Sequence, residues 1–149
     1  MQRTHTDQQP IWQTTLGEGC QLTVLQTAQA QQAAVALSFA AGSHHEPAQY
    51  LGMAHFLEHL VFRGSEKYAA DDGLMAFIQR HAGQVNAQTQ GQQTLFHFQV
   101  DAPLLQDALA RLVDMLTAPL LSSELLRTER EVINEEFALY CRTPQVLMD

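Results

Sequence analysis

The sequence has few cysteines, and their positions exclude two kinds of structure. Cys20 and Cys141 lie far apart, with neither a CxxC pair nor a histidine tract beside them. This spacing argues against a disulfide framework and against a zinc site built from thiolates. We interpret both cysteines as packing residues rather than nucleophiles. The cysteine usage fits a reducing compartment, so we expect a cytoplasmic protein, with the periplasm as the alternative.

Basic residues and long apolar segments are also scarce. The chain has 8 lysines and arginines against 16 aspartates and glutamates, which gives a formal net charge of -8. No basic stripe forms on any predicted element, so we expect neither nucleic acid nor an anionic membrane surface as a partner. The polar opening MQRTHTDQQPIWQTT lacks the apolar core of a signal peptide. No later segment has the roughly 20 apolar residues that a membrane-spanning helix needs.

The apolar residues that are present predict a fold of strands and helices around one core. The chain has 149 residues, 46% of them hydrophobic, which is enough for one domain or a part of one. Period-two patterns and turn glycines predict a hairpin around residues 17–19, a strand within 33–43 and a second hairpin formed by 84–90 and 94–100. Helices are predicted within 52–65, 71–83, 102–118 and 122–140. Hairpins with helices grouped after them favour an α+β fold, in which an antiparallel sheet packs against helices.

The segment GMAHFLEHLVFRGS, residues 52–65, places three titratable side chains in an otherwise apolar helix. It is apolar on every side, so we expect a helix buried in the core, ended by Arg63 and Gly64. His55 and His59 lie one turn apart and point the same way, so their imidazoles can converge on one metal ion. Glu58 lies at the edge of that face. There a carboxylate is better placed to act on a water molecule at the metal than to be a third ligand.

The last predicted helix offers the third ligand that a catalytic zinc site requires. Glu129 and Glu136 are seven residues apart, which places them only about 20° apart on the helical wheel and within the apolar stripe of the helix. Glu131 and Glu135 lie off that stripe. Burial of an ionised carboxylate without a partner is costly, so two inward-facing glutamates indicate a cation or an imidazolium near them. The wheel therefore selects Glu136 over Glu135. The apolar stripe that contains the two inward glutamates consists of Leu125, Val132, Ile133, Phe137 and Tyr140.

Ordinary interpretations exist for each of these residues. A histidine on an apolar helix is usually a core residue, so the HxxEH pattern alone is a weak signal; the paired glutamates favour the metal site. A strand residue such as Asn86 is most often part of the wet face of a sheet. The remaining histidines that we interpret as ordinary turn, helix-end or strand residues are His44, His45, His81 and His97.

The order HFLEH, followed by EREVINEE, resembles the inverzincin metallopeptidases, the family of pitrilysin, insulin-degrading enzyme and mitochondrial processing peptidase. GQVNAQT is similar to a further motif of that family, and the resemblance covers essentially the whole chain. Within the family, GMAHFLEHLVFRGSEKY, DGLMAFIQRHAGQVNAQT and EREVINEEF look most similar to the peptidases associated with pyrroloquinoline quinone biosynthesis. That resemblance implies the glutamate–tyrosine crosslinked precursor peptide as substrate.

The resemblance implies a role for each candidate site residue. It implies a zinc endopeptidase acting on small peptides, with a bound Zn2+ ion and Glu58 as the general base. Glu129 is then grouped with the catalytic residues, as the acid that supports a ligating histidine. Asn86 and Ala87 match the edge-strand position at which family members hold the substrate backbone by strand addition. The implied zinc ligands are His55, His59 and Glu136.

Family enzymes contain several domains of this kind, and a complete first domain is longer than this chain. The resemblance therefore implies that residues 1–149 are the N-terminal part of a catalytic domain, truncated before the remaining strands of its sheet. Later domains of the full-length enzyme are also absent and would be its partners. Such a fragment is expected to bind zinc with little turnover. The alternatives are a general pitrilysin-like oligopeptidase, a non-catalytic domain that binds metal or peptide, and a fragment that self-associates through open sheet edges.

Overall fold

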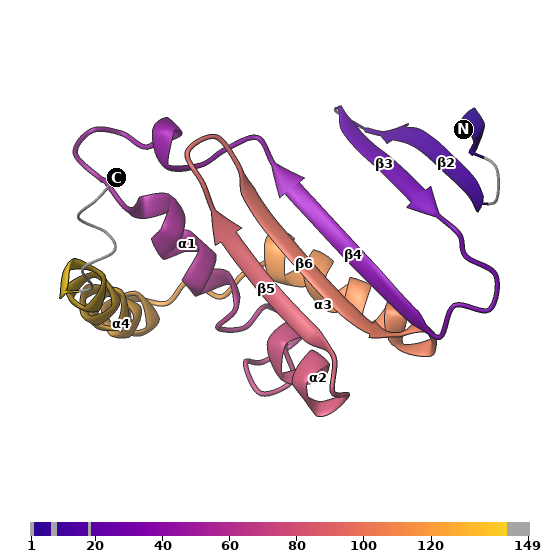
Figure 1. Cartoon of the computed structure of the whole chain (residues 1–149). Coiled ribbons are helices and arrows are strands. Elements are labelled where there is room, and N and C mark those ends of the chain that lie inside the picture. Colours follow the sequence, from indigo (N-terminus) through magenta and orange to yellow (C-terminus); the bar gives the residue numbers. More distant parts are fainter. Residues whose placement is uncertain (1, 7–8, 18, 143–149) are drawn as a thin grey trace. The chain divides into compact units, whose positions relative to one another are not determined.

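The structure is a computed structural model that describes residues 2–6, 9–17 and 19–142 (Figure 1). The chain divides into two compact units, Met1–Gln31 and Gln32–Asp149. Among the described residues, none of the helices combines the length and apolar character needed to cross a bilayer.

The first unit is a three-stranded antiparallel sheet in the order β1 (Gln2–Thr6), β2 (Gln9–Leu16) and β3 (Cys20–Leu25). The predicted hairpin is confirmed. Gly17 and Gly19, at its turn, have φ values of 47° and 91°, which glycine adopts without steric cost. The strand β1 was not predicted, because QRTHT contains no apolar residue to mark a strand.

The second unit contains another antiparallel sheet, and its central strand carries much of the core. The order is β4 (Gln32–Phe39), β6 (Thr94–Asp101) and β5 (Gln84–Thr89), which confirms the second predicted hairpin. Phe96, Phe98 and Val100 of β6 are buried. Residues opposite one another across the three strands form apolar rows, because the pleat directs them to the same face. These rows are Val35, Phe98 and Val85, then Leu37, Phe96 and Ala87.

Four α-helices accompany this sheet: α1 (Met53–Val61), α2 (Leu74–Arg80), α3 (Leu105–Thr117) and α4 (Ser123–Arg142). Short 3-10 helices span Ser43–His45 and Ala102–Leu104. Helices α2 and α3 contact the sheet and share one buried core with it, and α1 contributes Val61 to the same core while it contacts β5 and α4 (Figure 1). The predicted α+β fold, with an antiparallel sheet packed against helices, is confirmed.

Two predicted faces are less buried than their sequences indicate. In α1 only Leu60 and Val61 are buried, and Met53 and Leu57 are 44% and 48% exposed, so the expectation of a helix buried on every side was wrong. The cause is a lack of neighbours, since α1 contacts β5, α4 and the first 3-10 helix only on part of its circumference. In α4 the apolar stripe packs along its first half, and Phe137 is 70% exposed. The side chain of Tyr140 lies outside the described residues.

Candidate metal centre

Helices α1 and α4 bring three metal-ligating side chains together. The Nε2 atoms of His55 and His59 are 3.2 Å apart, which the one-turn spacing on α1 produces. Oε2 of Glu136, on α4, lies 3.5 Å from Nε2 of His59. One ligand atom from each of the three residues lies within 4.8 Å of the others. Within the part of the chain that the structure describes, this is the one group of three such residues that could hold a metal.

The donor set fits zinc. Two imidazole nitrogens and one carboxylate oxygen are typical of catalytic zinc sites, which use three protein ligands and keep one position open. The two histidines are half-buried and Glu136 is exposed, so the group is accessible from solvent. Glu135, which the helical wheel rejected, is exposed and belongs to no such group.

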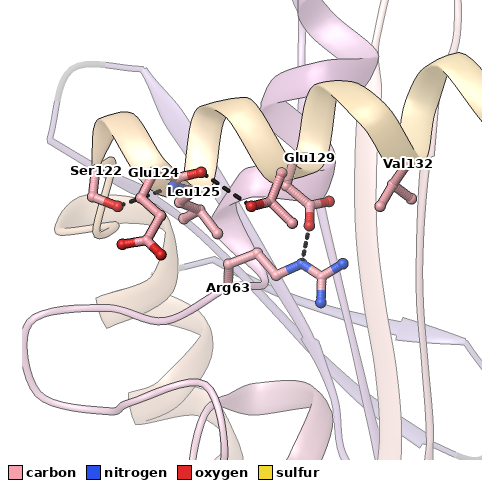
Figure 2. A pocket seen from close by; sticks show the side chains of 7 residues that line it. Arg63, Ser122, Glu124, Leu125, Glu129 and Val132 are labelled. Atoms are coloured by element: carbon pink, nitrogen blue, oxygen red, sulfur yellow. Dashed lines mark hydrogen bonds and ion pairs between the residues drawn. The ribbon is translucent and has the colours of Figure 1, made fainter.

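Glu129 lies on the other side of the His59 ring. Its side chain is almost fully buried, and its Oε2 atom is 3.6 Å from Nδ1 of His59, which is longer than a hydrogen bond. Its Oε1 atom accepts a 2.6 Å contact from Nε of Arg63 (Figure 2). The two glutamates of α4 therefore lie near different nitrogens of the His59 ring, Glu129 near Nδ1 and Glu136 near Nε2. Sequence reasoning gave Arg63 only as a helix stop, so its contact with Glu129 was missed.

Glu58 lies beside this group and is held by the sheet. Its Oε2 atom accepts a 2.5 Å hydrogen bond from the hydroxyl of Thr89, the last residue of β5. Sequence reasoning missed Thr89, because no local pattern links it to a residue 31 positions earlier. Glu58 also lines a cavity of about 210 Å³, whose other lining residues are His59, Phe62, Arg63, Met75, Asn86 and Ala87.

Asn86 and Ala87 lie on β5, an edge strand of the described sheet. The N–H of Gln90 donates to the carbonyl of Gln93, so the even-numbered residues of β5 face β6 with their backbone groups. The N–H of Ala87 consequently points to the open edge, where it donates to Oδ1 of its neighbour Asn86 at 2.9 Å. This edge and the Glu58 side chain border the same cavity.

The start of α1 is fixed by a residue outside the helix. Gly52 precedes the helix with a φ of 88°, and no side chain caps the helix at that position. Instead, the Glu46 carboxylate accepts hydrogen bonds of 2.7 Å from the N–H groups of Gly52 and Ala54. Sequence reasoning missed this contact, since Glu46 lies several residues before the usual capping position.

Comparisons with known proteins point to the same relationship as the motifs. The chain is 48% identical over 125 residues to "Coenzyme PQQ synthesis protein F" of Klebsiella pneumoniae, covering 84% of this chain and 16% of that protein. It is 46% identical over 134 residues to the protein of that name from Pseudomonas putida, covering 90% and 18%. The crystal structure of pitrilysin superposes with a TM-score of 0.81 at 31% identity, over 93% of this chain and 15% of that one.

The chain thus spans less than a fifth of the length of these curated relatives. The resemblance to pitrilysin-like peptidases, and within them to proteins of pyrroloquinoline quinone biosynthesis, is confirmed. The sequence profile of the insulinase family matches residues 22–149, a range that includes every residue of the candidate centre. The chain therefore belongs to the insulinase family, peptidase family M16.

Proposed function

We propose that this chain is the zinc-holding catalytic part of an endopeptidase that hydrolyses peptide bonds in small peptides. The observation that carries the proposal is the convergence of ligand atoms from His55, His59 and Glu136 within 4.8 Å. The relatives are named for coenzyme PQQ (pyrroloquinoline quinone) synthesis, which supports a role in that synthesis, and the substrate that we propose is a precursor peptide of the coenzyme. Because this chain spans less than a fifth of those relatives, we propose that residues of later domains act together with it.

Each residue has a proposed role in the reaction. His55, His59 and Glu136 hold the ion, and bound zinc supplies Lewis acidity toward the scissile carbonyl and toward water. Glu58 takes a proton from the attacking water and returns it to the leaving amine. The hydroxyl of Thr89 holds Oε2 of Glu58, which leaves Oε1 of the same carboxylate for the water. Glu129 supports His59 from the opposite side of its ring.

The open edge of β5 is the proposed binding surface for the substrate backbone. An extended peptide would add to the edge as a further strand, and its carbonyl would replace the Asn86 side chain on the N–H of Ala87. A substrate side chain would then enter the adjacent 210 Å³ cavity, which brings the scissile bond close to Glu58. Recognition through the backbone explains how peptides of different sequence could bind.

Metal content tests the ligand assignment. We expect about one zinc per purified chain and loss of that zinc in His59→Ala, since catalytic sites use three protein ligands. Glu136→Gln should weaken zinc binding, and Glu135→Gln, its neighbour outside the group, should not. Chelator competition measures both affinities. Equal affinities for the two glutamine variants would contradict Glu136 as the third ligand.

Turnover by the full-length protein tests the role of Glu58. Glu58→Gln should retain zinc, because it removes no ligand, and should lower kcat by about 10²–10⁴-fold, the usual contribution of a general base. Cleavage of a peptide that contains the precursor sequence, beside an unrelated peptide, separates a dedicated processing enzyme from a general oligopeptidase. Zinc binding without cleavage of either peptide would indicate a binding domain instead.

A further inference from the structure

Arg63 makes an ion pair that the proposed mechanism does not use. It follows Phe62, the C-cap residue of α1, and its Nε atom is 2.6 Å from Oε1 of Glu129 on α4 (Figure 2). Figure 2 shows the guanidinium and the carboxylate directed toward each other from the two segments. Glu129 is 1% exposed, whereas the Arg63 side chain is 47% exposed.

The burial of Glu129 requires a cation close to it. A carboxylate removed from water without compensation loses its hydration, and breaking a buried ion pair by removing one partner is strongly destabilising. Arg63 is suited to this task because a guanidinium stays protonated under all ordinary conditions. Its contact with Oε1 is short and therefore fixes one oxygen of the carboxylate in place.

The second oxygen is then left for His59. Oε2 of Glu129 is buried and has no hydrogen-bond partner among the described residues, and the nitrogen paired with it is Nδ1 of His59 at 3.6 Å. A proton on Nδ1 leaves Nε2 of the neutral ring without one. Nε2 is the nitrogen that lies against His55 and Glu136.

We infer that Arg63 is a positioning residue for the metal centre: it orients the Glu129 carboxylate so that His59 carries its proton on Nδ1 and presents a bare Nε2 to the metal. This inference rests on the proposed zinc site and adds a residue to it. Carboxylate partners of metal-ligating histidines fix the tautomer and the ring orientation in this way, and their loss typically lowers metal affinity. Arg63 acts one step further away, through Glu129.

The test uses the 149-residue chain and two readouts. Nitrogen-15 shifts of the His59 ring in the metal-free chain report which nitrogen is protonated, and chelator competition reports the zinc affinity. The variants are Arg63→Met, which keeps an unbranched side chain as far as the position of Nε without its charge, and Arg80→Met as the matched control. Arg80 also pairs with a carboxylate, that of Asp72, outside the candidate centre.

We expect His59 to be protonated on Nδ1 in the wild-type chain. Arg63→Met should move the population toward the Nε2-protonated form and weaken zinc binding by about 10–100-fold, the usual effect of losing such a partner. Arg80→Met should change neither quantity. An unchanged tautomer and unchanged affinity in Arg63→Met would overturn the inference.

The inference about Arg63 can still be tested if Arg63→Met does not fold or if the wild-type chain binds no zinc. If Arg63→Met does not fold, Arg63→Lys keeps a cation beside the buried carboxylate but lacks the Nε group that contacts Oε1 of Glu129. A wild-type tautomer of His59 in Arg63→Lys would overturn the inference, and a shifted tautomer would support it. If the wild-type chain binds no zinc, the proposed function fails, whereas the tautomer in the metal-free chain still decides the role of Arg63.

Discussion

At the scale of single residues, Glu46 supports the start of the helix that carries both histidines. Its carboxylate accepts the N–H groups of Gly52 and Ala54, which no helical carbonyl can pair. We predict that Glu46→Ala lowers the free energy of unfolding by about 1–2 kcal/mol, the usual cost of losing a cap. Urea denaturation measures the loss, and Glu66→Ala, at an exposed glutamate, is the control. Equal stabilities of the two variants would contradict a capping role.

The site residues differ in how far the sequence could predict them. His55 with His59, and Glu129 with Glu136, follow from helical spacing, which a sequence displays directly. The structure brings Glu136 within 3.5 Å of His59, as the wheel predicts. Arg63, Glu46 and Thr89 were missed because their partners lie on other elements or outside the usual capping positions. Such contacts depend on tertiary packing, about which local periodicity carries no information.

At the scale of secondary-structure elements, the exposure of α1 shows the limit of hydrophobic patterning. Periodicity tells which faces of a helix are apolar, but not whether a neighbour exists for each face. The outer face of α1 instead borders an apolar cavity of about 680 Å³ that Phe39, Met53 and Leu57 line and that reaches Glu58. The strands of the second unit, in contrast, were predictable because hairpin pairing is local.

Gly42 lies in the loop before α1, where its backbone packs closely against the turn of the β5–β6 hairpin. A Cβ atom at Gly42 would lie 2.0 Å from the carbonyl oxygen of Gln90 and 2.8 Å from the backbone nitrogen of Gln93. Backbone atoms in a hairpin cannot yield easily, so we predict that Gly42→Ala lowers the free energy of unfolding by about 3 kcal/mol. At Gly52 a Cβ meets nothing within 4 Å, and Gly52→Ala should cost only the strain of its positive φ, about 1 kcal/mol. Chemical denaturation compares the two, and the reverse order would contradict the close contact at Gly42.

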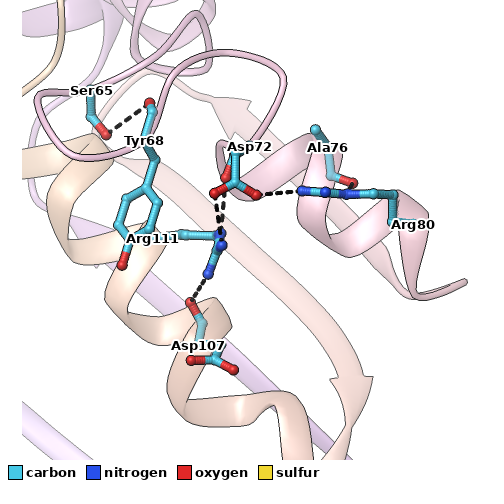
Figure 3. Close-up of polar contacts among 7 residues, drawn as sticks. All are labelled: Ser65, Tyr68, Asp72, Ala76, Arg80, Asp107 and Arg111. Carbon is cyan, nitrogen blue, oxygen red and sulfur yellow. Dashed lines mark hydrogen bonds and ion pairs between the residues drawn. The ribbon is translucent and has the colours of Figure 1, made fainter.

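Asp72 connects α2 and α3 through two arginines (Figure 3). Its Oδ1 atom accepts from Arg80 at 2.5 Å and its Oδ2 atom from Arg111 at 3.0 Å. The hydrogen bond from Arg80, aided by the charge of Arg111, holds the pKa of Asp72 below its ordinary value of 3.8. A depressed pKa stabilises the folded chain above pH 3.8, and this contribution is lost as the pH falls through the lower value in the folded state.

We therefore predict that Asp72→Asn destabilises the chain at neutral pH and that the difference from the wild type shrinks in acid. Protonation of Asp72 removes the same charge that the substitution removes, so the two proteins converge. Urea denaturation at about pH 7 and at about pH 3 measures the difference, since those values lie on either side of the ordinary carboxyl pKa. A difference that stays constant with pH would show that the charge of Asp72 does not contribute.

At the scale of the whole molecule, the candidate centre belongs to one compact unit. Its ligands, Glu58, Glu129 and the β5 edge all lie within Gln32–Asp149, as does the hydrophobic core that supports them. The sequence did not mark the division at Gln31, because the boundary has no proline-rich or glycine-rich linker and the first unit shows the same strand pattern as the second. The division follows from contacts, which composition does not reveal.

We predict that a chain lacking residues 1–31 folds and keeps the zinc affinity of the complete chain. The physical reason is that the contacts that position His55, His59 and Glu136 come from α1, α4 and β5, all in the second unit. Circular dichroism reports folding, and chelator competition reports the affinity of both chains. The sole tryptophan, Trp12, is lost in the truncation, so fluorescence cannot serve as the common probe. If the truncated chain folds but binds zinc more weakly, the first unit contributes to the geometry of the centre. If the truncated chain fails to fold, the core of the second unit does not suffice for stability.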